Sequence, residues 1–221
     1  MSVNKINYKN ILSELQSTNT TLVAVSKTKP TQEIIELYDL GQRDFGENYV
    51  QELTEKADLL PKDIRWHFIG HLQRNKVKYI APIVHLIHGV DSEKLLNEIN
   101  KEGRNNNRVI NCLLQIHIAQ EETKFGFDRQ EVTDLVDKIK SGKLDFEYVK
   151  ICGLMGMASF TEDMQKVSAE FKILHSLFNE GKQSFPEMDT LSMGMSGDYK
   201  IAVASGSTMV RIGSLLFGER V

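Results

Sequence analysis

The chain has 221 residues, of which 41% are hydrophobic, 26% charged and 8% aromatic, and its formal net charge is −3. These values are typical of a globular protein with one compact domain, and they exclude a disordered or fibrous chain. The weakly acidic charge, and the absence of any apolar run near the roughly 20 residues that cross a bilayer, favour neither nucleic-acid nor membrane binding.

The two cysteines and the N-terminal residues bear on location. Cys112 and Cys152 both lie in apolar, strand-like runs, and two cysteines are too few for a disulfide scaffold. The first ten residues lack the apolar core of a signal peptide. We therefore expect reduced thiols and a cytoplasmic protein.

Short apolar, β-branched runs alternate along the chain with longer amphipathic segments. The first 20 residues carry an amphipathic helix, and eight strand-then-helix units follow it. The expected strands lie in residues 21–27, 43–48, 65–70, 83–90, 107–118, 147–158, 189–196 and 208–213. The expected helices lie near residues 31–40, from 48, 73–79, from 92, 129–140, 162–180 and 199–204.

Eight strands separated by helices imply parallel pairing through right-handed crossovers. The count predicts an α/β fold, a single (β/α)8 barrel with an extra N-terminal helix. An open doubly wound sheet is the alternative, and it is disfavoured because no G-x-G-x-x-G motif follows the first strand. We expect one domain over 1–221, with residues 1–20 packed as a helix on the barrel.

Lys27 is the first residue with candidate chemistry, because reactive groups of such barrels lie where strands end. It ends the run 22–27, on the same side as Val23 and Val25. An apolar, enclosed site favours the neutral amine, which can attack an aldehyde to form a Schiff base. The alternative is a lysine whose ammonium reaches solvent at the barrel mouth.

Two glycine-containing turns near the C-terminus favour anion binding. The turn 194–197 places Ser196 between glycines, where it serves either as a hydroxyl donor or as a simple helix cap. Gly213 and Ser214 follow the last strand, where barrel loops commonly bind phosphate. Arg211 lies inside that apolar strand and needs an acceptor, either a carboxylate or a ligand atom. Barrel closure would bring Arg211 and Lys27 to one ligand.

The histidines give no recognisable metal motif. His67 and His71 are four residues apart but straddle a strand end and a glycine, and no third ligand follows at a known spacing. We therefore expect no metal site. His85, His88 and His117 are interpreted as hydrogen-bonded strand histidines.

Six strings together resemble a known family. They are AVSKTKP (24–30), FGENYVQE (45–52), WHFIGHLQRNK (66–76), GLMGMA (153–158), LSMGMSGDY (191–199) and VRIGSLLFG (210–218). In this order they resemble the pyridoxal phosphate homeostasis proteins, the YggS/PROSC group, which is similar to the N-terminal barrel of alanine racemase. The resemblance runs from near residue 22 to the C-terminus.

The resemblance implies a barrel that binds pyridoxal 5′-phosphate (PLP) and that lacks the C-terminal β domain of alanine racemase. By this match Lys27 forms the aldimine with PLP, and Arg211 faces the pyridine nitrogen. Ser196, Gly213 and Ser214 match the phosphate-binding positions. Two further positions, Asn48 and Met155, match pocket motifs, as does His67.

The resemblance also implies a protein of PLP homeostasis without robust turnover. An arginine at the ring nitrogen keeps that nitrogen unprotonated and weakens the cofactor as an electron sink. The alternative is a PLP-dependent enzyme, such as a weak amino-acid racemase that uses Tyr199 or His67 as second base. A cofactor-free lysine enzyme acting on a sugar phosphate is a third reading. We expect a monomer with PLP-dependent apoenzymes as acceptors, and no nucleic-acid or membrane partner.

Overall fold

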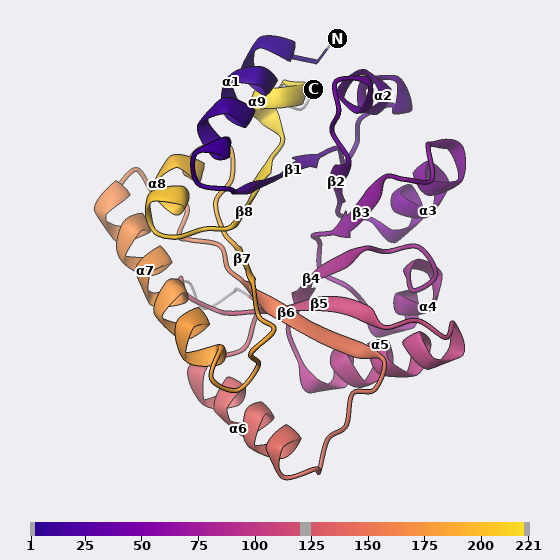
Figure 1. Ribbon diagram of the computed structural model, residues 1–221, viewed down its shortest axis with the longest axis vertical. Helices are drawn as coiled ribbons and strands as arrows, with labels where there is room; N and C mark the ends of the chain where they lie inside the picture. The colour runs from indigo at the N-terminus through magenta and orange to yellow at the C-terminus, as the bar shows by residue number, and fades with distance from the viewer. Residues whose placement is uncertain (1–2, 120–124, 219–221) are drawn as a thin grey trace.

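The computed structural model describes residues 3–119 and 125–218 and contains a closed barrel of eight parallel strands (Figure 1). The strands pair in chain order, and β1 closes the barrel against β8. This confirms the predicted (β/α)8 fold. The strands are β1 (Thr21–Val25), β2 (Asp44–Glu47), β3 (Arg65–Phe68), β4 (Leu86–Val90), β5 (Ile110–Gln115), β6 (Val149–Met155), β7 (Thr190–Ser192) and β8 (Met209–Ile212).

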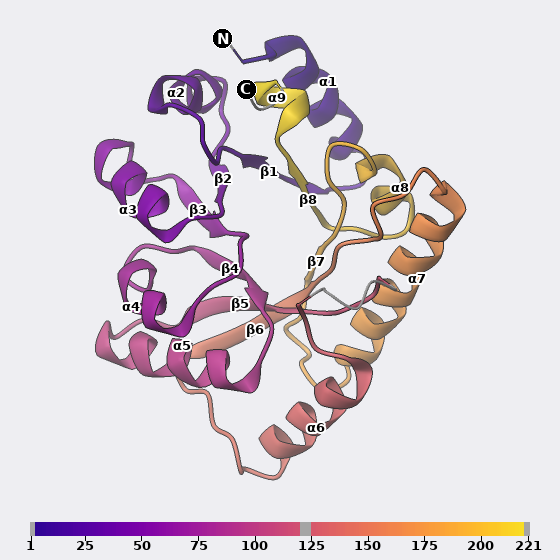
Figure 2. The same cartoon turned by 180° about the vertical axis from the view of Figure 1, so that it is seen from behind.

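Helices surround the barrel, as the two opposite views show (Figures 1 and 2). They are α1 (Lys5–Gln16), α2 (Thr31–Asp39), α3 (Val50–Leu59), α4 (Val77–Ile80), α5 (Glu93–Asn105), α6 (Arg129–Lys140), α7 (Met164–Gly181), α8 (Tyr199–Ala204) and α9 (Ser214–Phe217), with a 3-10 turn, η1, at Arg74–Lys76. The α6 helix begins with a capping box, in which Asp128 and Glu131 bond each other's backbone N–H groups.

Two boundaries differ from the sequence prediction at places that matter for the site. The β1 strand ends at Val25, so Lys27 lies in the following loop, where Lys29 N–H donates to the Ser26 carbonyl at 3.0 Å. The helix expected from residue 48 begins at Val50, which leaves Asn48 in the loop after β2. Lys27 and Asn48 therefore both lie in loops at the carboxyl end of the barrel strands.

The barrel separates two apolar clusters. The larger one lies between the strands and the surrounding helices, and it includes Phe45, Ile87 and Phe171, all fully buried. The smaller one fills the barrel interior and contains Val23, Leu86, Leu113, Met155 and Met209. The strands are buried on both faces, as expected for a parallel sheet covered by helices.

The two ends of the described chain lie side by side, because α1 and α9 are neighbours in both views (Figures 1 and 2). The Asn4 N–H donates to the Leu216 carbonyl at 2.8 Å, and the Asn7 amide donates to the Leu215 carbonyl at 3.1 Å. The α1 helix buries Tyr8, Ile11 and Leu15, whereas Ile6 and Leu12 are exposed.

None of the helices in the described residues is both long and apolar enough to cross a membrane.

Candidate functional site

A cavity of about 460 Å³ opens where the strands of the barrel end. Its volume lies within the range of small-molecule sites. Six of the seven cofactor-binding residues predicted from the sequence line it, together with Met157, Phe160 and Met195. The six are Lys27, Asn48, Ser196, Arg211, Gly213 and Ser214. A neighbouring cavity of about 580 Å³ shares Asn48 but lies against α3 and Tyr79, away from the lysine.

The loop that carries Lys27 is anchored by a buried ion cluster. The Ser26 hydroxyl donates to Glu47 Oε1 at 2.6 Å, and Lys56 Nζ donates to the same oxygen at 2.8 Å. Lys56 also donates to the Ser26 carbonyl at 2.8 Å and to Glu52 at 2.7 Å, while the Thr28 N–H donates to Glu52 at 2.6 Å. The residues on both sides of Lys27 are therefore held in place.

The pKa of Glu47 is raised to about 7, because burial disfavours its charged form more than Lys56 and Ser26 favour it. Its second oxygen, Oε2, is buried and has no hydrogen-bond partner within the described chain. Glu47 is therefore only partly satisfied: within that part of the chain Oε1 accepts hydrogen bonds and Oε2 does not. Lys56 lies at ion-pair distance from both Glu47 and Glu52.

The two predicted anion-binding turns meet in space. The Gly213 N–H donates to Ser196 Oγ at 3.2 Å, which joins the turn after β7 to the turn after β8. The chain reverses at Gly194, which has φ of +96° and would place a Cβ 2.5 Å from that of Ala202. The N–H groups at the start of α9 have no acceptor within that helix, as at every helix start. This corner of the cavity presents hydroxyls and N–H groups together.

Arg211 is a buried cation, with 5% of its surface exposed. Its guanidinium donates to the Ser192 carbonyl at 2.8 Å, the Ser192 hydroxyl at 2.6 Å and the Gly156 carbonyl at 3.2 Å. Within residues 3–119 and 125–218 it makes no ion pair with a carboxylate, so its acceptors are all uncharged. Burial lowers the pKa of Arg211 to about 10, which leaves it charged at neutral pH.

Asn48 and Met155 occupy different positions relative to the cavity. Asn48 lines it, and its side-chain oxygen is buried with no hydrogen-bond partner among the described residues. Met155 is 1% exposed in the barrel interior and is not among the residues that line the cavity. The residue two positions later, Met157, lines the wall instead. Both side chains belong to the same interior cluster, but Met155 ends β6 inside the barrel, whereas Met157 lies two residues past the strand end, at the level of the cavity.

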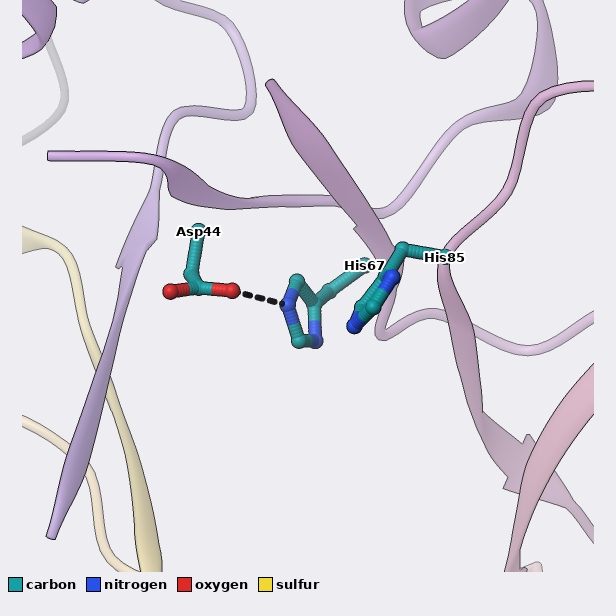
Figure 3. Close-up of side chains that lie close together, drawn as sticks. All are labelled: Asp44, His67 and His85. Carbon is teal, nitrogen blue, oxygen red and sulfur yellow. Dashed lines mark hydrogen bonds and ion pairs between the residues drawn. The ribbon is translucent and has the colours of Figure 1, made fainter. Parts of the chain in front are cut away.

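His67 and His88 are buried, and Asp44, His67 and His85 lie close together (Figure 3). His67 Nε2 lies 3.0 Å from Asp44 Oδ1, and His67 Nδ1 lies 2.9 Å from His88 Nε2. Asp44, His67 and His85 place three possible metal-ligand atoms within 4.8 Å of one another. Asp44, however, already accepts from Arg65 through both oxygens, and His67 uses both ring nitrogens. The arrangement is therefore a hydrogen-bonded network, and a metal ion would have to displace Arg65.

Neither residue considered as a second base lies in the cavity wall. The Tyr199 hydroxyl donates to Glu14 of α1 at 2.8 Å, and this hydrogen bond and burial raise its pKa, burial being the larger cause. His67 is 1% exposed and bonds within the barrel interior.

Two functional features escaped the sequence analysis. The anchor formed by Ser26, Glu47 and Lys56 joins β1, β2 and α3, and only the Glu52–Lys56 pair, four residues apart, gave a local signal. Ser192 was interpreted only as part of a strand, yet it is the hydroxyl acceptor of Arg211. Both features depend on contacts between distant strands.

The chain matches the family model described as alanine racemase, N-terminal domain, over residues 4–221. It is 40% identical over 204 residues to the pyridoxal phosphate homeostasis protein of Pasteurella multocida. This match covers 90% of this chain and 86% of that protein. The human protein of the same name is 43% identical over 212 residues, covering 90% and 76%. The structure of Synechococcus elongatus PipY with PLP bound has a TM-score of 0.82 and 33% identity, and covers 95% of this chain and 99% of that one.

Proposed function

The chain belongs to the pyridoxal phosphate homeostasis proteins, within the family of the alanine racemase N-terminal domain, and from this we propose that it binds PLP and serves its homeostasis. The observation that carries the proposal is that Lys27 and Arg211 line the same cavity. Arg211 is a buried cation that has no carboxylate partner in the described chain. Such a cavity favours an anionic ligand with an acceptor atom and an electrophilic carbon.

The residues of the cavity fit the parts of PLP. Ser196 and Ser214 offer hydroxyl donors to a phosphate, and the Gly213 N–H, which donates to Ser196 Oγ, holds that hydroxyl toward the start of α9. Arg211 offers guanidinium N–H groups to a ring nitrogen, and the unpartnered Asn48 oxygen offers an acceptor. Met155 lies in the barrel interior and would not contact the cofactor directly. It would support the cavity wall by packing near Met157.

Lys27 would hold the cofactor. PLP supplies an aldehyde, which condenses reversibly with a primary amine and releases water. Val25, Ile69 and Met157 line the same cavity as Lys27, and the ion cluster on both sides of Lys27 fixes its loop. A reversible link suits storage and release, since another amine displaces it.

We propose that turnover is weak or absent. A guanidinium cannot give up its proton to the ring nitrogen, so it leaves the bound cofactor a poor electron sink. Racemisation needs acid–base groups on both faces of the α-carbon, and neither Tyr199 nor His67 lines the cavity. We further propose a monomeric, cytoplasmic protein that gives PLP to acceptor apoenzymes. The two free cysteines support the reducing location.

The proposal is tested by borohydride reduction of the PLP-loaded protein, followed by tryptic digestion and mass spectrometry. We expect an absorbance band near the visible edge before reduction and a pyridoxyl group on the peptide that contains Lys27. The modification at another lysine, or at none, would overturn the proposal. Sustained loss of optical activity from chiral amino acids would favour the racemase alternative instead.

A further inference from the structure

A line of buried polar side chains crosses the barrel interior and ends on Arg211. It contains Asp44, His67, His88 and Ser192, which we call the interior relay. Successive heavy-atom distances are 3.0 Å from Asp44 to His67, 2.9 Å to His88, 3.0 Å to Ser192 and 2.6 Å to Arg211. All of these residues are at most 7% exposed. Asp44 begins β2, whereas Arg211 lines the cavity at the opposite end of the barrel (Figure 3 shows the Asp44 end).

The chemistry of the two ends assigns the protons between them. Arg211 has only donors, so Ser192 Oγ accepts from it. Burial would raise the pKa of Asp44, but the hydrogen bonds from Arg65 and His67 outweigh burial and hold it well below its usual range. Asp44 is therefore an acceptor, and His67 carries a proton on Nε2.

The middle of the relay then has one arrangement in which both rings are neutral. With His67 protonated on Nε2, its Nδ1 accepts from Nε2–H of His88. Burial first, and the nearby His67 and Arg211 second, keep the pKa of His88 well below its ordinary value, so His88 is neutral and its Nδ1 accepts. The Ser192 hydroxyl therefore donates to His88. Every hydrogen bond points from Arg211 toward Asp44.

This common direction has an electrostatic consequence. Each dipole turns its negative end toward the Arg211 guanidinium and its positive end toward the Asp44 carboxylate. Hydrogen bonds in such a chain polarise one another in a low-dielectric interior. Arg211 makes no ion pair with a carboxylate in the described chain, although Asp198 lies near enough to raise its pKa. The Asp44 carboxylate acts on Arg211 indirectly, through three uncharged side chains.

We propose that the interior relay positions Arg211, so that Asp44, at the far end of the barrel, sets the orientation and donor strength of the guanidinium in the cavity. The inference rests on the proposed function in one respect, namely that Arg211 contacts the bound PLP. Ser192, His88, His67 and Asp44 are positioning residues, because they act through Arg211 and do not line the cavity.

The first test needs no cofactor. Long-range ¹H–¹⁵N spectra of the histidine rings in the wild-type protein, with PLP removed, report which ring nitrogen carries the proton. We expect Nε2–H and an unprotonated Nδ1 on both His67 and His88. In Ser192→Ala we expect the Nδ1 resonance of His88 to move, because its hydroxyl donor is gone. A proton on Nδ1 of either ring in the wild type would overturn the relay.

The second test measures PLP affinity and the absorbance band of bound PLP in Ser192→Ala, Asp44→Asn and the double variant. Each single change should weaken affinity by about three- to tenfold and move the band in the direction seen in Arg211→Met. Ser192→Ala keeps both carbonyl acceptors of Arg211, so the guanidinium stays buried. The double variant should be no worse than the more affected single variant, because either change interrupts one chain.

Asp63→Asn is the matched control, since Asp63 precedes β3 at the same end of the barrel but pairs with Arg43 and Tyr38. It removes the same charge and should leave affinity and spectrum unchanged. Additive effects of Ser192→Ala and Asp44→Asn, or an equal shift in Asp63→Asn, would overturn the relay. A wild-type protein that does not retain PLP would overturn the proposed function instead, and the ring tautomers would still decide the relay.

Discussion

Two regions of the barrel each hold a buried cation, and they treat its charge differently. The Lys56 ammonium donates to three acceptors within 2.8 Å, namely the carboxylates of Glu47 and Glu52 and the Ser26 carbonyl. Around Arg211, the described chain supplies two carbonyls and the Ser192 hydroxyl. A compensated ion pair stabilises the fold, whereas a buried cation that makes no ion pair with a carboxylate in the described chain suits an anionic or acceptor ligand. The difference separates the anchor of the Lys27 loop from the site itself.

The strongest test of this comparison replaces one lysine in each region, Lys27 at the cavity and Lys56 in the anchor. Lys27→Met should abolish covalent attachment of PLP and lower the free energy of unfolding by less than Lys56→Met does. Lys56→Met should leave attachment possible but lower stability by about 3–5 kcal/mol, because it leaves Glu47 and Glu52 without their cation. Urea unfolding and mass spectrometry after borohydride reduction distinguish the two. Equal stability losses would contradict the assignment of separate roles.

Replacement of Arg211 tests the region whose charge is not compensated. Arg211→Met should reduce PLP affinity by about 2–5 kcal/mol, because the ring nitrogen loses its donor. Its stability should fall by about 1–3 kcal/mol, because the Gly156 carbonyl and the Ser192 hydroxyl lose a buried donor, which is less than the loss expected for Lys56→Met. Equilibrium dialysis against PLP gives the affinity, and thermal unfolding without cofactor gives the stability. Unchanged PLP affinity would show that Arg211 does not contact the cofactor.

Ser196→Ala probes the phosphate corner more gently. Loss of one hydroxyl donor to a charged group should cost about 1–3 kcal/mol of PLP affinity. Pyridoxal, which has no phosphate, should bind both proteins equally. Ser141→Ala, at the end of α6, is the control and should bind PLP as the wild type does. A parallel loss for pyridoxal would place Ser196 elsewhere in the pocket.

The smallest expected effect concerns pH and the Asp44 end of the barrel. The native pKa of Asp44 is depressed, so its contribution to stability is present above the ordinary aspartate value and is lost as pH falls toward the native pKa. Asp44→Asn should therefore lose about 1 kcal/mol less stability than the wild type between pH 4 and pH 3. Urea midpoints across pH 3–7 measure this. Parallel acid limbs in both proteins would contradict the depressed pKa.

Local sequence was sufficient to predict the elements and the neighbourhood of the cavity. Apolar periodicity and the regular alternation of runs predicted all eight strands, and closure of the barrel followed from their number. Lys27, Ser196, Gly213 and Ser214 were identified because each lies next to the end of a strand, where barrel sites are built, and Arg211 because it is a cation inside an apolar strand. The PLP contacts of these residues remain predictions.

The amino-acid order by itself therefore determined the barrel and the residues at its mouth, since periodicity and strand ends are properties of neighbouring residues. Only the tertiary structure decided what surrounds each of them. Met155 turned inward while Met157 lines the cavity, Tyr199 pairs with Glu14, and Ser192 connects Arg211 to His88. Such contacts join residues up to 185 positions apart, and no local pattern encodes a hydrogen bond formed across the barrel interior.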